Sequence, residues 1–192
     1  AGGNICYADS PEGLNREHAI FGASRCVAVS PSDTAPALVA LDATMVISSE
    51  SGQRTMSAQD FFIGPDRDIR NMTALDDGEI LTAVRLPGEW ADAEFYFEKV
   101  ADRNVWDFAL TSVAAVMKVS GGTIEDARIA CGAVECVPRR LESVESAIRG
   151  QQRSEELGAR AGEMAVEGAR PLNYNNFKVP LMANLVARAV RG

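Results

Sequence analysis

The order of apolar and polar residues predicts one strand–turn–helix unit around which the rest of the chain is organised. Residues 26–29 are a short apolar run, which is typical of a strand. Pro31-Ser32-Asp33 then supplies helix-start chemistry, and residues 35–41 carry apolar side chains at helical spacing. Ser32 or Asp33 can cap the first free amides of this helix. Its N-terminus suits two interpretations, an ordinary cap or a contact with phosphates or the polar edge of a cofactor.

The pattern downstream predicts two groups of strands and one group of helices. A hairpin is expected at residues 44–48 and 54–56, a helical turn at 57–62 and a strand at 79–86, which Pro87 ends. Strands at 94–100, 109–119 and 123–134 read as an antiparallel meander, with Gly121-Gly122 as one tight turn. Helices follow at 140–149, 154–168 and 177–191, the second capped by Ser154. Strands followed by helices indicate an α+β fold, and the composition change at 88–92 favours a boundary between residues 1–88 and 89–192.

Composition and charge narrow the classes of partner. The chain has 192 residues and a formal net charge of −8, without a basic cluster, so neither nucleic acid nor an anionic membrane is an expected partner. We expect no membrane span, because no apolar run approaches about 20 residues. A single histidine, His18, argues against a metallohydrolase and is interpreted as structural.

The cysteines and the first glycines offer candidate binding chemistry. Cys131 lies in a strand-like run and is expected to be a buried free thiol, and Cys136 is expected to be structural. Cys6 and Cys26 lie in irregular sequence, where a ligand role is physically possible. Gly2-Gly3-Asn4 allows either a plain turn or a close approach of the backbone to a ligand.

Taken in order, these pieces resemble the flavin-binding medium subunit of the molybdenum hydroxylases, the xanthine dehydrogenase, aldehyde oxidoreductase and carbon monoxide dehydrogenase group. The matching features are Ala-Gly-Gly-Asn at 1–4, His-Ala-Ile-Phe-Gly at 18–22, the unit at 26–43, Gly-Glu-Ile-Leu at 78–81, Lys99, Phe-Ala-Leu at 108–110, Ala-Cys-Gly-Ala-Val at 130–134 and Asn-Phe-Lys-Val-Pro at 176–180. The resemblance runs the whole length, and the ordered set carries it rather than any single motif.

The resemblance implies both an architecture and an activity. Residues 1–88 would be the second FAD-binding subdomain, a mixed sheet with short helices. The N-terminal part of the FAD-binding domain would be absent from this sequence. Residues 89–192 would be a C-terminal domain, a three-stranded antiparallel sheet packed with helices. The subunit would bind FAD and pass electrons from iron–sulfur clusters to an external acceptor, with no catalytic residue of its own. A large subunit with the molybdenum cofactor and a small [2Fe–2S] subunit would be its partners, in the cytoplasm, or in the periplasm if a partner carries an export signal.

Site residues carried over from the resemblance fall at both ends of the first subdomain and beyond it. Gly2, Gly3 and Asn4 would lie along the FAD phosphates and ribityl chain. Ser32 and Asp33 would hydrogen-bond the cofactor, Leu81 would touch the flavin ring, and Lys99 would lie near the isoalloxazine edge and tune its electronics.

The resemblance also gives the cysteines a possible role as metal ligands. The aldehyde oxidoreductase and hydroxybenzoyl-coenzyme A reductase branches carry an extra [4Fe–4S] cluster, and Cys6 and Cys26 fall where two of its ligands would be. Such a cluster needs four thiolates. Either the cluster is absent, or a stretch of loop is missing between Ile5 and Cys6; the short junction favours the second.

One other function stays open, a non-catalytic α+β module that docks to a larger oxidoreductase complex. It is supported by the absence of a Gly-rich pyrophosphate loop from the sequence and of a complete catalytic constellation.

Overall fold

A small antiparallel sheet occupies the first half of the chain. The computed structural model describes residues 6–23 and 25–192. The sheet has the strand order β2-β1-β3 and consists of β1 (Thr44–Ser49), β2 (Gly52–Ser57) and β3 (Ile80–Arg85). Both strand pairs are antiparallel, so the expected hairpin and third strand are confirmed, whereas the expected mixed pairing is not what forms. The two-residue turn between β1 and β2 leaves no room for a parallel crossover, so this pair has to be antiparallel.

The second sheet is the predicted meander with one short strand added. Its order is β4-β5-β6-β7, and its strands are β4 (Glu94–Val100), β5 (Thr111–Ser120), β6 (Thr123–Gly132) and β7 (Arg139–Arg140). Gly121 and Gly122 join β5 to β6 at φ values of 55° and 82°, a conformation that glycine adopts without steric cost. The α+β fold class is therefore confirmed, and the two-residue β7 is the part that the sequence did not show.

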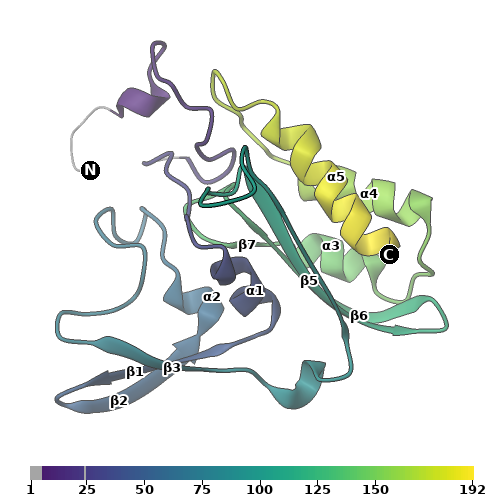
Figure 1. Ribbon diagram of the computed structural model, residues 1–192, viewed down its shortest axis with the longest axis horizontal. Coiled ribbons are helices and arrows are strands. Elements are labelled where there is room, and N and C mark those ends of the chain that lie inside the picture. Colours follow the sequence, from purple (N-terminus) through teal and green to yellow (C-terminus); the bar gives the residue numbers. More distant parts are fainter. Residues whose placement is uncertain (1–5, 24) are drawn as a thin grey trace.

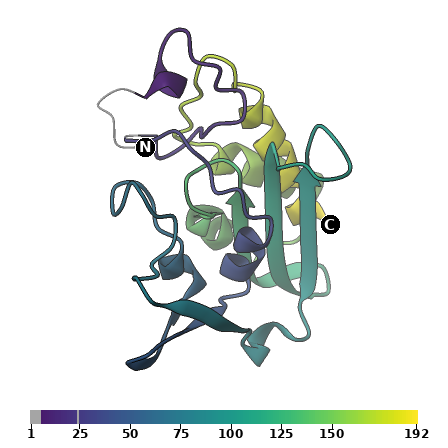
Figure 2. The same cartoon turned by 60° about the vertical axis from the view of Figure 1, so that its left-hand side comes forward.

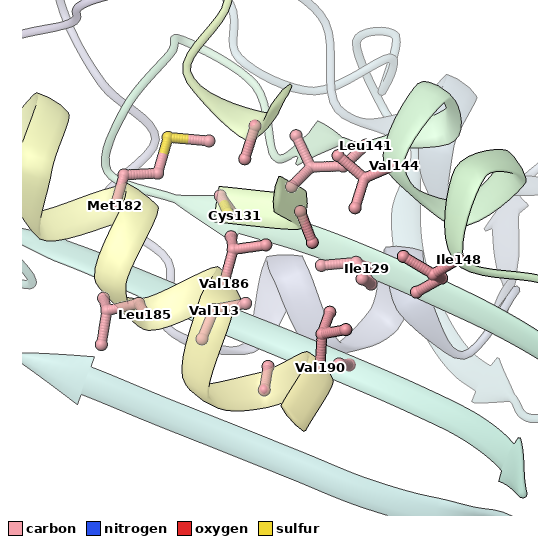
Figure 3. Packing of buried hydrophobic residues seen from close by; sticks show 14 of the residues in the cluster. Val113, Ile129, Cys131, Leu141, Val144, Ile148, Met182, Leu185, Val186 and Val190 are labelled. Carbon is pink, nitrogen blue, oxygen red and sulfur yellow. The ribbon is translucent and has the colours of Figure 1, made fainter. Parts of the chain in front are cut away.

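Three helices cover one face of this second sheet (Figure 1). They are α3 (Glu142–Ile148), α4 (Glu155–Ala165) and α5 (Lys178–Arg191). As predicted, Ser154 caps α4, because its hydroxyl accepts a hydrogen bond from the Leu157 amide at 3.1 Å. Met182, Leu185, Val186 and Val190 of α5 pack onto β5 and β6 in the main apolar core (Figure 3). Burial of each such side chain stabilises the fold by about 1.5–3 kcal/mol.

The opposite face of the second sheet is covered by α1 (Thr34–Ala40), which lies between the two sheets (Figures 1 and 2). Val39 and Ala40 of α1 share one buried cluster with Met45 of the first sheet and with Ala114 and Ala130 of the second. The remaining short helices are η1 (Tyr7–Asp9), α2 (Ala58–Phe61) and η2 (Gly88–Trp90). Because this cluster joins both halves, the division at residues 88 and 89 stays a prediction.

The segment before α1 differs from the expected strand. Residues 26–29 are irregular; the Val27 carbonyl accepts a hydrogen bond from the Ala19 amide, and the Ser30 amide donates to the Glu135 carbonyl. The backbone groups of this segment therefore hydrogen-bond to two separate loops rather than to one neighbouring strand. A local apolar pattern does not reveal such partners. Over the described residues, none of the helices combines the length and the apolar composition that crossing a bilayer requires.

Candidate functional site

The N-terminus of α1 places two predicted site residues side by side with different roles. The Ser32 hydroxyl accepts a hydrogen bond from the Ala35 amide at 3.2 Å, so Ser32 provides the cap. The Asp33 carboxylate instead accepts a hydrogen bond from the Lys99 ammonium at 2.6 Å. The carboxylate is therefore directed away from the helix amides and towards the second sheet.

Lys99 reaches this position from the end of β4. Its ammonium also donates to the Asp107 carbonyl at 2.5 Å, which ties the loop after β4 to the same point. The Lys99 and Asp33 side chains are 26% and 46% exposed, so their attraction is screened and contributes about 0–1 kcal/mol to stability. This ion pair joins residues 66 positions apart in the sequence. Because it adds so little to stability, its charged groups are available to contact a ligand.

A small hollow of about 90 Å³ opens beside this ion pair. It is lined by Glu17, Val29, Ser30, Pro31, Ser32, Asp33, Phe108, Ala109, Ser112 and Ala133. Pockets that enclose a small-molecule ligand measure about 300–1,000 Å³, so the hollow has room for one edge of a ligand and not for a whole dinucleotide. A bound dinucleotide would have to continue across the neighbouring surface.

That neighbouring surface is aromatic. Trp106 is 98% exposed and has a φ of 48°, and Phe108 is 70% exposed. A tryptophan in the left-handed region is unusual, and such conformations gather at functional sites. The loop also borders a second hollow of about 400 Å³, lined from Lys99 to Asp107. Polar groups at one hollow and exposed rings beside it suit a ligand with a polar chain and a flat ring system.

The other residues that the resemblance assigns to the cofactor either lie on a different element or fall outside the described residues. Leu81 is on β3 of the first sheet, where it packs against the cluster around Val39 and Ala40. Gly2, Gly3 and Asn4 lie outside the described residues. The structure therefore brings together Ser32, Asp33 and Lys99, and their role in binding stays a prediction.

The cysteines do not assemble a four-thiolate site in the described part of the chain. Cys6 is exposed, whereas Cys26 lies beside Cys136, whose thiol is 2.9 Å from the Ala28 carbonyl and 4.0 Å from the Cys26 carbonyl. Burial raises the pKa of the Cys136 thiol to about 12, which opposes the thiolate form that iron needs. Among the described residues, no group of three or more His, Cys, Asp or Glu side chains is placed to hold a metal. The [4Fe–4S] cluster stays a prediction without structural support, and Cys131 is buried and free, as expected.

Several residues around the hollow were missed by the sequence reasoning. Arg16 makes two hydrogen bonds to Asp102, at 2.7 and 2.8 Å, and its guanidinium lowers the pKa of that carboxyl. Lys178 approaches from α5; it belongs to the motif at 176–180, to which the resemblance assigns no role. Trp106 lies in the loop after β4. Two signals were available, namely the Asn-Phe-Lys-Val-Pro motif at 176–180 and Val105-Trp106, an apolar pair in the connection between two strands.

Two family descriptions cover nearly all of the chain. Residues 1–89 match the FAD binding domain in molybdopterin dehydrogenase, and residues 96–192 match the CO dehydrogenase flavoprotein C-terminal domain. The chain belongs to the family of FAD-binding medium subunits of molybdenum hydroxylases.

Individual relatives match most of the chain. The chain is 35% identical to the aldehyde oxidoreductase FAD-binding subunit PaoB of Escherichia coli K12, over 92% of this chain and 52% of that protein. It is 30% identical to the carbon monoxide dehydrogenase medium chain of Hydrogenophaga pseudoflava, over 83% of this chain and 55% of that one. The chain thus spans about half the length of the curated relatives it matches.

Solved structures agree with the fold. Quinoline 2-oxidoreductase from Pseudomonas putida 86 superposes with a TM-score of 0.72 at 30% identity, over 85% of this chain and 55% of that chain. Carbon monoxide dehydrogenase from Hydrogenophaga pseudoflava gives a TM-score of 0.73 at 28% identity, over 82% of this chain and 54% of that chain.

Proposed function

We propose that this chain binds FAD across the surface between α1 and the loop after β4, as the flavoprotein part of a molybdenum-dependent oxidoreductase. The observation that carries the proposal is the ion pair of Asp33 with Lys99, which joins the two family-matched regions beside the hollow. Family membership supplies the identity of the ligand, and the geometry supplies residues suited to its parts.

The described residues fit part of an FAD molecule. Asp33 keeps free lone pairs beyond the bond to Lys99 and can accept hydrogen bonds from ribityl or ribose hydroxyls. Lys99 offers positive charge near the ring system, and Trp106 and Phe108 offer faces on which a flat ring can stack. Because the hollow is small, these residues would hold one side of the cofactor. When bound, FAD supplies the one- and two-electron chemistry that the side chains lack.

The proposed reaction is electron transfer between subunits. Iron–sulfur clusters in a small partner subunit would deliver electrons that a molybdenum centre in a large partner subunit takes from the substrate. The residues around Asp33 and Lys99 would hold the flavin on the route of these electrons to an external acceptor. This chain's own part is to hold the flavin, keep water from it and set its electrostatic surroundings. The [4Fe–4S] cluster is not included in this route, because the described cysteines do not fit it.

Two substitutions test the proposal in the natural protein purified with the subunits that accompany it. Asp33→Asn and Lys99→Met each remove one partner of the ion pair, and a charge-assisted hydrogen bond to a ligand is worth about 1.5–3 kcal/mol. We therefore expect a loss of roughly tenfold or more in FAD affinity, with little change in the unfolding midpoint. Glu94→Gln is the matched control, because Glu94 also lies on β4 and accepts a hydrogen bond from Arg153 at 2.6 Å.

The same measurement distinguishes the alternative function. Unchanged flavin content and unchanged electron transfer in both variants would favour a docking module that leaves the cofactor to other chains. A loss of flavin in the Glu94→Gln control as large as in the two variants would also contradict a specific site at Asp33 and Lys99.

A further inference from the structure

A fully buried lysine at the start of α5 has no assigned role in the site. Lys178 has 0% of its surface exposed, and its ammonium donates to the Glu17 carbonyl and to the Ala133 carbonyl, both at 2.7 Å. Burying a cation is costly unless it is well paired. Two main-chain acceptors from segments far apart in the sequence are a specific pairing.

The neighbouring Asn175 holds the same loop. It is also fully buried, and its amide group donates to the His18 carbonyl at 3.0 Å and to the Ala19 carbonyl at 3.1 Å. Asn175 and Lys178, at the start of α5, therefore hydrogen-bond three consecutive carbonyls, those of residues 17–19. We name Asn175 and Lys178 together the C-terminal clamp.

Both acceptors of Lys178 belong to residues that line the hollow with Ser32 and Asp33. Ala133 has a φ of 61°, a left-handed conformation that is unfavourable for alanine and persists where its surroundings enforce it. The bond from Lys178 to the Ala133 carbonyl is one such constraint. The wall of the hollow is thus held in an unfavourable conformation by a side chain that lies behind it.

Further contacts link the start of α5 to the loop after β4, which carries Trp106. Phe177 precedes Lys178 in the sequence, and the Arg16 guanidinium lies 5.3 Å from the centre of the Phe177 ring. The same guanidinium makes the two hydrogen bonds to Asp102. Asp102 belongs to the loop that carries Trp106. The start of α5 is therefore linked both to the hollow and to the surface beside it.

We propose that Lys178 is a positioning residue for the FAD site, which fixes the carbonyls of Glu17 and Ala133 so that the hollow beside Asp33 keeps the shape that the cofactor contacts. The inference rests on the proposed function, and it assigns a role to Lys178 of the Asn-Phe-Lys motif at 176–178, which the family resemblance left without one.

The test compares Lys178→Met with Val190→Ala in the natural protein and its accompanying subunits. Methionine keeps the length of the side chain and removes both donors. Val190 is also fully buried, but it lies near the other end of α5 and packs in the main core, so it reports the effect of destabilising this helix alone. FAD affinity and the visible circular dichroism of bound flavin are measured at a temperature where far-ultraviolet circular dichroism shows both variants folded.

We expect Lys178→Met to weaken FAD binding at least about tenfold and to alter the visible circular dichroism, with both unchanged in Val190→Ala. Wild-type affinity and spectrum in Lys178→Met, or equal losses in Val190→Ala, would overturn the inference and leave the proposed function intact. Wild-type protein that binds no FAD would overturn both. If Lys178→Met does not fold, Lys178→Gln, which keeps an amide donor, serves instead, with a three- to tenfold loss expected and no loss as the refuting result.

Discussion

The crossing of α4 and α5 leaves no room for a side chain at two glycines of α4, and this gives a quantitative stability test. A Cβ atom added at Gly162 would lie 2.4 Å from the Ala183 carbonyl oxygen, and one added at Gly158 would lie 2.7 Å from the Ala187 carbonyl oxygen. Contacts below 3.0 Å are essentially never made by real Cβ atoms. The helices must therefore separate by at least 0.6 Å for Gly162→Ala (3.0 minus 2.4) and by 0.3 Å for Gly158→Ala (3.0 minus 2.7).

The magnitude follows from two opposing effects. Overpacking of this kind costs about 1–3 kcal/mol, and a backbone carbonyl cannot rotate out of the way, which favours the upper part of that range. Alanine is the better helix former by about 1 kcal/mol, which offsets part of the cost. We expect Gly162→Ala to lower the free energy of unfolding by about 1–2 kcal/mol and Gly158→Ala by less than about 1 kcal/mol.

Urea unfolding of both variants, followed by far-ultraviolet circular dichroism, measures this order. Gly64→Ala is the control, because its added Cβ would meet only the Val137 side chain at 3.8 Å and should change stability little. A Gly162→Ala variant as stable as the wild type, or less affected than Gly158→Ala, would refute the close crossing.

Three further outcomes can be measured on the same protein. Burial lowers the pKa of Lys178 to about 8 from its ordinary 10.5, so the unfolded chain binds more protons between these values. Stability should therefore rise with pH across this interval relative to Lys178→Met, by up to about 3 kcal/mol, and a parallel pH dependence of the two would contradict it. Arg54 lowers the pKa of Glu79 to about 2, so the stability that this pair contributes should be present above pH 4.5 and lost as pH falls towards 2, measured as a shrinking difference in unfolding midpoint from Glu79→Gln. Ser154→Ala should lower the unfolding free energy by about 1 kcal/mol, and an unchanged urea midpoint would show that the cap of α4 is dispensable.

The elements with strong periodicity were predictable from the sequence. The meander of β4, β5 and β6 alternates or runs apolar over strands of seven, ten and ten residues, and a glycine pair with the required positive φ joins the last two. The helices at the end of the chain each carry an apolar stripe, which α5 buries against β5 and β6. In these cases the local pattern and the tertiary packing demand the same structure.

The site was predictable only in part, because its geometry depends on contacts between distant residues. Ser32, Asp33 and Lys99 were identified through the family resemblance, yet the bond between Asp33 and Lys99 joins residues 66 apart, and no local period records such a pair. Lys178 reads as an ordinary polar residue at a helix start, and its burial becomes visible only when the loop at residues 15–19 folds over it. The irregular path of residues 26–29 has the same origin, since two separate loops satisfy its backbone.

The position of α1 explains why the candidate site lies where it does. Its apolar side enters the cluster shared by both sheets, and Pro36 packs so closely on β6 that a Cβ at Gly132 would lie 2.7 Å from it. The helix is thus seated directly on the second sheet, and its first turn faces the ends of β4 and β5, where Lys99 pairs with Ser112 in register. Close packing at a glycine fixes Ser32 and Asp33 relative to Lys99 more firmly than their own exposed ion pair could. These candidate binding residues are therefore held by apolar contacts beneath them, which leaves their polar groups available to a ligand.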